Sequence, residues 1–195
     1  MTIIGITGPT GAGKTTALNE LEKLGGVIID CDAVYHELLK SNYTLQKELG
    51  ARFGVLTDEN GVFDRKKLGA VVFHDPAALA DLNAIAHRHV VMAVKEILVQ
   101  AEAQNIPAAA IDAIALFESG LAELCDATVA ITAPAEIRVE RIMARRGSLV
   151  SMPSPVSMPR ILRSFTPAVA SIPCAMTAKV LRSLARAQGN FLAAF

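Results

Sequence analysis

The chain of 195 residues and 20.6 kDa is long enough for one α/β domain with a small additional lobe and too short for two full catalytic domains. Hydrophobic residues make up 52% of it and charged residues 19%, which excludes a disordered, collagen-like or disulfide-scaffold protein. Because 19 acidic residues balance 19 basic ones, no overall positive charge favours nucleic-acid binding, and we expect no nucleic acid among the partners.

The N-terminal part shows the strand and helix alternation of a parallel α/β sheet. Thr2–Thr7 is an apolar, β-branched run that ends at a glycine, which is typical of a strand buried on both faces. A glycine-rich loop follows, and from Lys14 the leucines recur with the spacing of a helix. Val27–Asp30 predicts a second buried strand, and residues 33–39 predict a helix after it.

The rest of the regular pattern consists of a helical insertion and two further strands. The expected elements are helices at 44–53, 65–73 and 75–104, strands at 107–116 and 127–132, and a charged helix from 134 to about 146. No strand signal interrupts the first three helices, so we expect them to form an insertion at about residues 40–104.

The cysteines indicate the compartment. Cys31, Cys125 and Cys174 share no metal-type spacing and are odd in number, which is typical of a protein in a reducing compartment. The N-terminus lacks a basic region before a long apolar stretch, and no run of about eighteen apolar residues occurs. We therefore predict a cytoplasmic protein with no membrane segment.

Residues 8–15, Gly-Pro-Thr-Gly-Ala-Gly-Lys-Thr, match the phosphate-binding motif G-x-x-x-x-G-K-[ST]. The motif stands between a predicted strand and a predicted helix, a context that favours it over an ordinary glycine-rich turn. Backbone N–H groups of such a loop converge on phosphate oxygens, and the helix N-terminus favours negative charge. Lys14 is expected to reach the β- and γ-phosphates of a nucleotide, and the Thr15 hydroxyl to ligate Mg²⁺.

Carboxylates follow the second and third predicted strands. Asp30 and Asp32 lie at the carboxyl end of the second strand, the sheet edge where ligands bind. A carboxylate there can hold the water shell of Mg²⁺ or accept a hydroxyl proton during phosphoryl transfer. Either aspartate could instead cap the following helix, and the spacing does not choose between them. Asp112 and Glu118 lie near the two ends of the third strand, and Glu118 is the better functional candidate.

Histidines and arginines supply further candidates on two helices. His87 and His89 are two residues apart on a helix and point to different faces, so they are a poor metal pair, and a packed or solvated histidine is the simpler interpretation. Arg138, Arg141 and Arg145 share one face of the last predicted helix. They could brace the transferring phosphates as a lid does, or form a solvated basic face.

An ordered set of segments resembles the dephospho-CoA kinase family: GITGPTGAGKTT, VIIDCDAVYHELL, FDRKKLGAVVF, LNAIAHRHV, LFESGL and RVERIMARR. The resemblance covers about residues 1–147. It implies transfer of the ATP γ-phosphoryl group to the ribose 3′-hydroxyl of dephospho-CoA, the last step of coenzyme A synthesis. It also implies an α/β, adenylate-kinase-like P-loop fold with a five-stranded parallel core, helices on both faces, a helical CoA-binding lobe and a small lid.

The resemblance assigns a role to each candidate. It implies ATP and Mg²⁺ as cofactors, with Asp32 as the general base, Lys14 and Arg141 as further catalytic residues, and Thr15 and Asp30 as metal ligands. It places His87 and Glu118, with Asp32, in the acceptor pocket, and Arg141 and Arg145 at the start of the lid. The phosphate cradle is Gly11, Ala12, Gly13, Lys14, Thr15 and Thr16.

Two other functions stay open at this point: another small-molecule or nucleoside monophosphate kinase, and a nucleotide-binding protein that does not turn over. A screen of acceptors with ATP separates the first from a dephospho-CoA kinase, and tight ATP binding without transfer would favour the second. We expect ATP and dephospho-CoA as the small-molecule partners and a monomer or small homo-oligomer.

The resemblance ends near Ser148. Residues 1–140 carry 11 basic and 19 acidic side chains, whereas residues 141–195 carry 8 basic and none acidic. Five of the nine prolines lie between Pro153 and Pro173, a density at which we expect no regular element. We therefore divide the chain into a kinase core, residues 1–147, and an aberrant tail, residues 148–195, that replaces the rest of the lid, the last strand and the C-terminal helix.

We predict that this tail is translated from a shifted reading frame of a dephospho-CoA kinase gene. Codons for residues 150–166 can be chosen so that translation from the third base of the Val150 codon gives E-Y-A-Q-S-R-I-N-A-Q-N-P-P-E-F-Y. Family members carry a segment close to E-Y-A-x-x-R-I-x-A-Q-x-P-x-x-F at this point. We expect incomplete closure over ATP, an uncovered sheet edge, low stability and weak or absent kinase activity.

Overall fold

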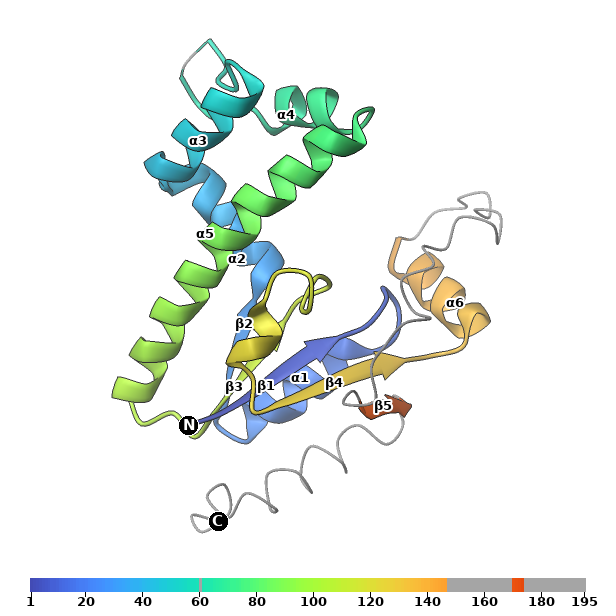
Figure 1. Ribbon diagram of the computed structural model, residues 1–195. Helices are drawn as coiled ribbons and strands as arrows, with labels where there is room; N and C mark the ends of the chain where they lie inside the picture. Colours follow the sequence, from blue (N-terminus) through green and yellow to red (C-terminus); the bar gives the residue numbers. More distant parts are fainter. Residues whose placement is uncertain (60, 147–169, 174–195) are drawn as a thin grey trace.

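The computed structural model describes residues 1–59, 61–146 and 170–173, with side chains up to Ala144 (Figure 1). The elements in chain order are β1 (Thr2–Thr7), α1 (Lys14–Lys23), β2 (Val27–Asp30), α2 (Cys31–Ser41), α3 (Tyr43–Phe53), α4 (Arg65–Val72), α5 (Pro76–Ala103), β3 (Ala108–Asp112), η1 (Leu121–Leu124), β4 (Ala127–Thr132), α6 (Ala135–Arg146) and β5 (Ala170–Pro173). Among these residues, no helix is both long and apolar enough to cross a membrane.

The strands form one parallel sheet in the order β2-β3-β1-β4-β5. β1 lies between β3 and β4, with Ile4 opposite Ala110 on one side and Ala127 on the other. The chain therefore crosses over the sheet between strands, and the crossovers are helical, as in other parallel sheets. The predicted α/β fold with a parallel sheet is confirmed.

Three details differ from the predictions. β5 pairs with β4 in parallel, Val129 opposite Ala170. Two expectations are therefore wrong for Ala170–Pro173: that no regular element forms among the tail prolines, and that the loss of the last strand leaves the sheet edge uncovered. The proline of β5 is tolerated because it stands at the end of a strand on the edge of the sheet. The third strand is shorter than the predicted 107–116, since it ends at Asp112. The helix predicted at 33–39 begins directly after β2, at Cys31.

Opposite faces of the sheet are covered by α1 and α5. In β3, Ala110 packs on the α1 side with Leu18 and Leu21, whereas Ala109 and Ile111 pack on the α5 side with other apolar residues. Side chains alternate between the faces of a strand, so both sides of β3 must be apolar to be buried. This explains its continuous Ala-Ala-Ala-Ile sequence.

The helical insertion forms a lobe at the far end of α5, away from the sheet (Figure 1). Its helices begin at carboxylate or amide caps: Asn42 accepts the backbone N–H of Leu45, and Asp64 and Asp75 each accept two backbone N–H groups. The lobe has its own small core, which consists of Leu39, Leu45, Leu49, Leu56, Leu68, Val72 and Ala78. α2 and α5 run from this lobe to the sheet and connect the two parts.

Candidate active site

The phosphate-binding motif forms the loop between β1 and α1, as its position in the sequence predicts. Gly11 has a φ of 80°, and a Cβ added there would lie 2.8 Å from the carbonyl oxygen of Arg138. A residue with a side chain is therefore excluded at this position both by backbone conformation and by the approach of α6. Gly13, with a φ of 103°, is the N-cap of α1, so the loop leads directly into the helix N-terminus.

The ammonium group of Lys14, the first residue of α1, contacts one oxygen atom of the loop and one at the end of β3. Its Nζ donates to the carbonyl oxygen of Gly8 at 3.1 Å and lies 3.6 Å from Oδ1 of Asp112. Burial raises the pKa of the Asp112 carboxyl above its usual value, and the nearby Lys14 charge only partly opposes this effect. Asp112 and Lys14 thus place a carboxylate and an ammonium group together at the carboxyl edge of the sheet.

These groups face a cavity of about 540 Å³ that opens beside the loop. The residues that line it come from the loop, α1, α2, the end of β3 and α6: Pro9, Thr10, Gly11, Ala12, Gly13, Lys14, Thr15, Thr16, Asp32, Asp112, Ile114, Arg141 and Ala144. The cavity therefore brings together the whole predicted phosphate cradle with Asp32 and Arg141.

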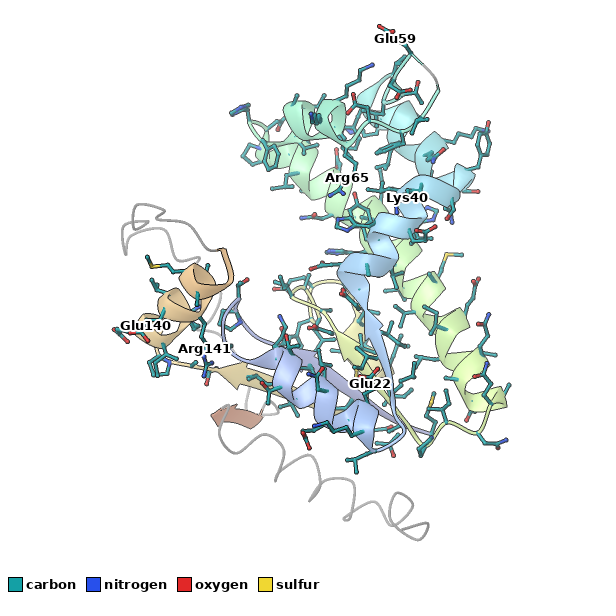
Figure 2. The ribbon with its side chains drawn as sticks, turned by 180° about the vertical axis from the view of Figure 1, so that it is seen from behind. Glu22, Lys40, Glu59, Arg65, Glu140 and Arg141 are labelled. Carbon is teal, nitrogen blue, oxygen red and sulfur yellow. The ribbon has the colours of Figure 1, made fainter. Side chains whose placement is uncertain are left out.

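Arg141 connects α6 to the phosphate-binding loop. Its Nη1 donates to the carbonyl oxygens of Gly11 at 3.1 Å and Ala12 at 3.3 Å. Figure 2 shows Arg141 on the side of α6 that faces the loop, while the neighbouring Glu140 lies on the outer side. Because two carbonyl oxygens hold the guanidinium at the cavity wall, its positive charge is positioned for anionic groups bound inside.

The two aspartates after β2 have different environments. Asp30 is the N-cap of α2, and its Oδ1 accepts the backbone N–H groups of Asp32 at 2.9 Å and Ala33 at 3.0 Å. The capping alternative is therefore correct for Asp30, and Asp30 is not among the residues that line the cavity. Asp32 is exposed and does line it, so of the two aspartates only Asp32 borders the cavity.

A second cavity, of about 210 Å³, lies between α2, α5 and the turn after β3. It contains His87, whose pKa is lowered by burial although the Glu118 carboxylate opposes the shift. Cys31 also lines it, and burial together with nearby carboxylates raises the pKa of this thiol to about 12, so the thiol stays protonated at neutral pH. Asp32 lines this cavity as well as the first one.

The remaining candidates lie elsewhere. Glu118 is exposed and is not part of the lining of either cavity, although its charge acts on His87. His89 is buried and its Nε2 lies 3.3 Å from Oε2 of Glu48, so it is a packed histidine as the simpler interpretation has it. The prediction for Arg145 concerns a side chain outside the described part.

Sequence reasoning missed one residue of the site. Asp112 was passed over in favour of Glu118, yet it is Asp112 that lies beside Lys14 in the cavity. The sequence did contain a signal for Asp112: it is the first polar residue after a continuous apolar run, and that position lies at the carboxyl edge of a parallel sheet, where ligands bind.

Comparisons with known proteins point to one family. A family model described as dephospho-CoA kinase matches residues 2–153. The dephospho-CoA kinase of Latilactobacillus sakei is 37% identical over 142 residues, 73% of this chain and 70% of that protein. That of Moorella thermoacetica is 38% identical over 147 residues, 74% of this chain and 69% of that protein.

Solved structures agree with the sequence matches on the fold. The crystal structure of TT1252 from Thermus thermophilus has a TM-score of 0.67 at 27% identity and covers 95% of this chain and 97% of its own. The dephospho-CoA kinase from Campylobacter jejuni has a TM-score of 0.62 at 20% identity, with 95% and 98% covered. The second likeness concerns the fold alone.

Proposed function

The chain belongs to the dephospho-CoA kinase family, and we propose that it transfers the γ-phosphoryl group of ATP to the ribose 3′-hydroxyl of dephospho-CoA. The observation that carries this proposal is that Asp32 lines both cavities. A phosphoryl transfer needs a donor and an acceptor on opposite sides of one reacting group. Asp32 lies where the two cavities meet, and the transferred phosphoryl group would have to pass through this region.

ATP is assigned to the larger cavity. The backbone N–H groups of residues 11–16 and the N-terminus of α1 would bind its phosphates, since a helix N-terminus carries a partial positive charge. Lys14 would exchange its contact with the Gly8 carbonyl oxygen for phosphate oxygens, and Arg141 would neutralise charge from the α6 side.

The residues around this cavity suit Mg²⁺. Magnesium prefers oxygen ligands, keeps several waters, and is usually bound through one or two protein groups together with substrate phosphates. The Thr15 hydroxyl and the Asp112 carboxylate are oxygen donors that line the same cavity. Asp112 is better placed for this role than Asp30, whose Oδ1 is used by the cap of α2. When bound, the ion would neutralise charge on the β- and γ-phosphates.

Asp32 is the proposed general base. Its exposed carboxylate can accept the proton of a hydroxyl that enters from the smaller cavity, because it lines that cavity too. His87 lines the same cavity with a lowered pKa, so it is neutral and can exchange hydrogen bonds with the acceptor without adding charge. Glu118 contributes through its charge near His87, and Arg145 is proposed for the lid together with Arg141.

Residues 1–147 form the kinase core of this proposal, with α3, α4 and part of α5 as the acceptor-binding lobe. Cys31 and Cys125 are both free thiols, which is consistent with a cytoplasmic location. The proposed reading-frame change in the tail concerns residues that lie outside the described part, apart from Ala170–Pro173.

An acceptor screen tests the proposed function. The purified chain is incubated with Mg·ATP and, separately, with dephospho-CoA, AMP, CMP, dTMP and gluconate, and the products are identified by mass spectrometry. The proposal expects coenzyme A from dephospho-CoA and no comparable product from the others. Faster phosphorylation of a nucleoside monophosphate or a sugar acid would overturn it, and ATP binding without any transfer would favour the inactive nucleotide-binding alternative.

A further inference from the structure

In the described part of the chain, one residue besides Asp32 lines both cavities, and this residue is Ile114. It lies in the turn after β3, which Figure 1 shows in yellow at the end of the sheet nearer the helical lobe. Ile114 is 62% exposed, whereas Ala113 and Leu116 in the same turn are buried. A large aliphatic side chain is therefore exposed where the two cavities meet.

The backbone around Ile114 is tied to the end of β1. The backbone N–H of Ala113 donates to the carbonyl oxygen of Ile6 at 3.2 Å, and Oγ1 of Thr7 donates to the carbonyl oxygen of Ile114 at 3.3 Å. Thr7 is buried, and the phosphate-binding loop begins at the next residue. A β-branched side chain also has few accessible rotamers. Ile114 therefore has a defined position beside the loop.

The proposed base does not choose its acceptor by itself. Asp32 is exposed, so its carboxylate can take a proton from a water molecule as well as from a ribose hydroxyl. In that side reaction the water oxygen bonds to the γ-phosphorus, the bond from this phosphorus to the bridging oxygen breaks, and the water proton passes to Asp32. The products are ADP and inorganic phosphate. Productive transfer therefore requires that water is kept away from the γ-phosphoryl group.

Ile114 has the properties that exclude water from this region. An ordered water molecule in a protein makes about three hydrogen bonds with polar groups. The Ile114 side chain supplies no polar atom, and its carbonyl oxygen already accepts the Thr7 hydroxyl. Ligands that fill both cavities would cover the exposed side chain, and burial of apolar surface is favourable.

We propose that Ile114 is a specificity residue for the phosphoryl transfer: its side chain keeps water out of the junction of the two cavities, so that transfer to the acceptor hydroxyl outcompetes hydrolysis of ATP. The proposal rests on the proposed function and adds to it the residue that discriminates between a hydroxyl acceptor and water. The two shared residues then have separate tasks. Asp32 takes the proton, and Ile114 excludes the competing nucleophile.

The ratio of inorganic phosphate to coenzyme A tests this role, because a loss of stability lowers both products together. Both are measured for the full chain at saturating Mg·ATP, and phosphate release is measured again without dephospho-CoA. Ile114→Ser gives water space and a hydrogen-bonding group. We expect it to raise the ratio, and phosphate release without acceptor, by about twofold to tenfold, the effect of one hydrogen bond. Ile114→Val keeps an apolar β-branched side chain, so its ratio should equal that of the parent.

Val99→Ser is the matched control, because Val99 is exposed to a similar extent, 67%, and lines neither cavity. The inference is overturned if Ile114→Ser releases no more phosphate than Val99→Ser, or if Ile114→Val raises the ratio as much as Ile114→Ser does. A parent chain that forms no coenzyme A would instead overturn the proposed function. Phosphate release without acceptor would still decide the role of Ile114, so the two failures are distinguishable.

Discussion

Replacing Asp32 by asparagine separates chemistry from binding in this site. Asn is nearly the same size as Asp but cannot take a proton at neutral pH. Loss of a general base typically slows a reaction by about 10²–10⁴-fold, which corresponds to about 2.7–5.5 kcal/mol of transition-state stabilisation. We expect a fall of this size in kcat, with the affinity for ATP unchanged within a few-fold, because Asp32 acts on the acceptor hydroxyl.

The fold should survive this change. Asp32 is exposed in the first turn of α2, and the cap of that helix is Asp30, not Asp32. The favourable interaction of the Asp32 charge with the helix dipole is worth about 0.3–1 kcal/mol, which is small beside the expected kinetic effect. A loss of kcat of a hundredfold or more therefore cannot be attributed to unfolding.

Asp30→Asn is the matched control for the same assay. Asparagine caps a helix as well as aspartate does, so this variant removes a charge two residues away and keeps the cap. Turnover is measured as coenzyme A formed, by mass spectrometry at saturating dephospho-CoA, and ATP affinity by calorimetry. The assignment of Asp32 is refuted if Asp32→Asn keeps near-parental turnover, or if Asp30→Asn loses as much.

Two further predictions concern the residues that face the phosphates. Lys14→Ala should weaken ATP binding by about tenfold to hundredfold and lower turnover with it, since the ammonium meets phosphate oxygens in ground and transition states alike; unchanged affinity in calorimetry would contradict the P-loop assignment. Burial raises the pKa of Asp112 in the folded chain, so folding favours its protonated form and the parent loses stability as the pH rises above about 4, through the raised pKa. Asp112→Asn should therefore unfold at a higher temperature than the parent at pH 7, and this advantage should vanish near pH 3; a less stable variant at pH 7 would show that the Lys14 pair outweighs burial.

Most of the fold could be predicted from local signals in the first 146 residues of the sequence. Buried strands without polar interruptions, a glycine-rich loop and Asp or Asn caps are consistent with one another and with the parallel sheet that forms. The phosphate cradle could be predicted because the motif is local and its flanking elements identify it. Asp30 and Asp32 could not be separated, because only the backbone geometry after β2 decides which carboxylate turns back to cap α2.

Features built from distant segments could not be predicted. The end of the third strand was placed too late because Ala113 to Leu116 continues the apolar run without a glycine or proline. In the structure the chain turns there, with the backbone N–H of Ala113 donating to Ile6 and Ile114 exposed. The meeting of Arg65 with His36 likewise depends on how the lobe folds back on α2, which no sequence period encodes.

The proposed reading-frame change predicts different effects on ATP binding and on turnover. The residues that hold the phosphate-binding loop, including Arg141 with its bonds to Gly11 and Ala12, all precede Ser148 and are the same in either frame. Restoring the predicted frame in the encoding DNA should therefore leave ATP affinity nearly unchanged, because the cradle is complete already. Turnover should rise, because the frame supplies the arginine and glutamine of the family's lid segment, and closure of a lid completes the catalytic arrangement. The test is calorimetry with ATP and coenzyme A formation for both chains, after sequencing of the DNA across residues 140–195 and an intact-mass spectrum of the parent. Genomic DNA that encodes this tail in frame in a stable, active enzyme would refute the reading-frame change, since the tail would then have to supply the closure itself.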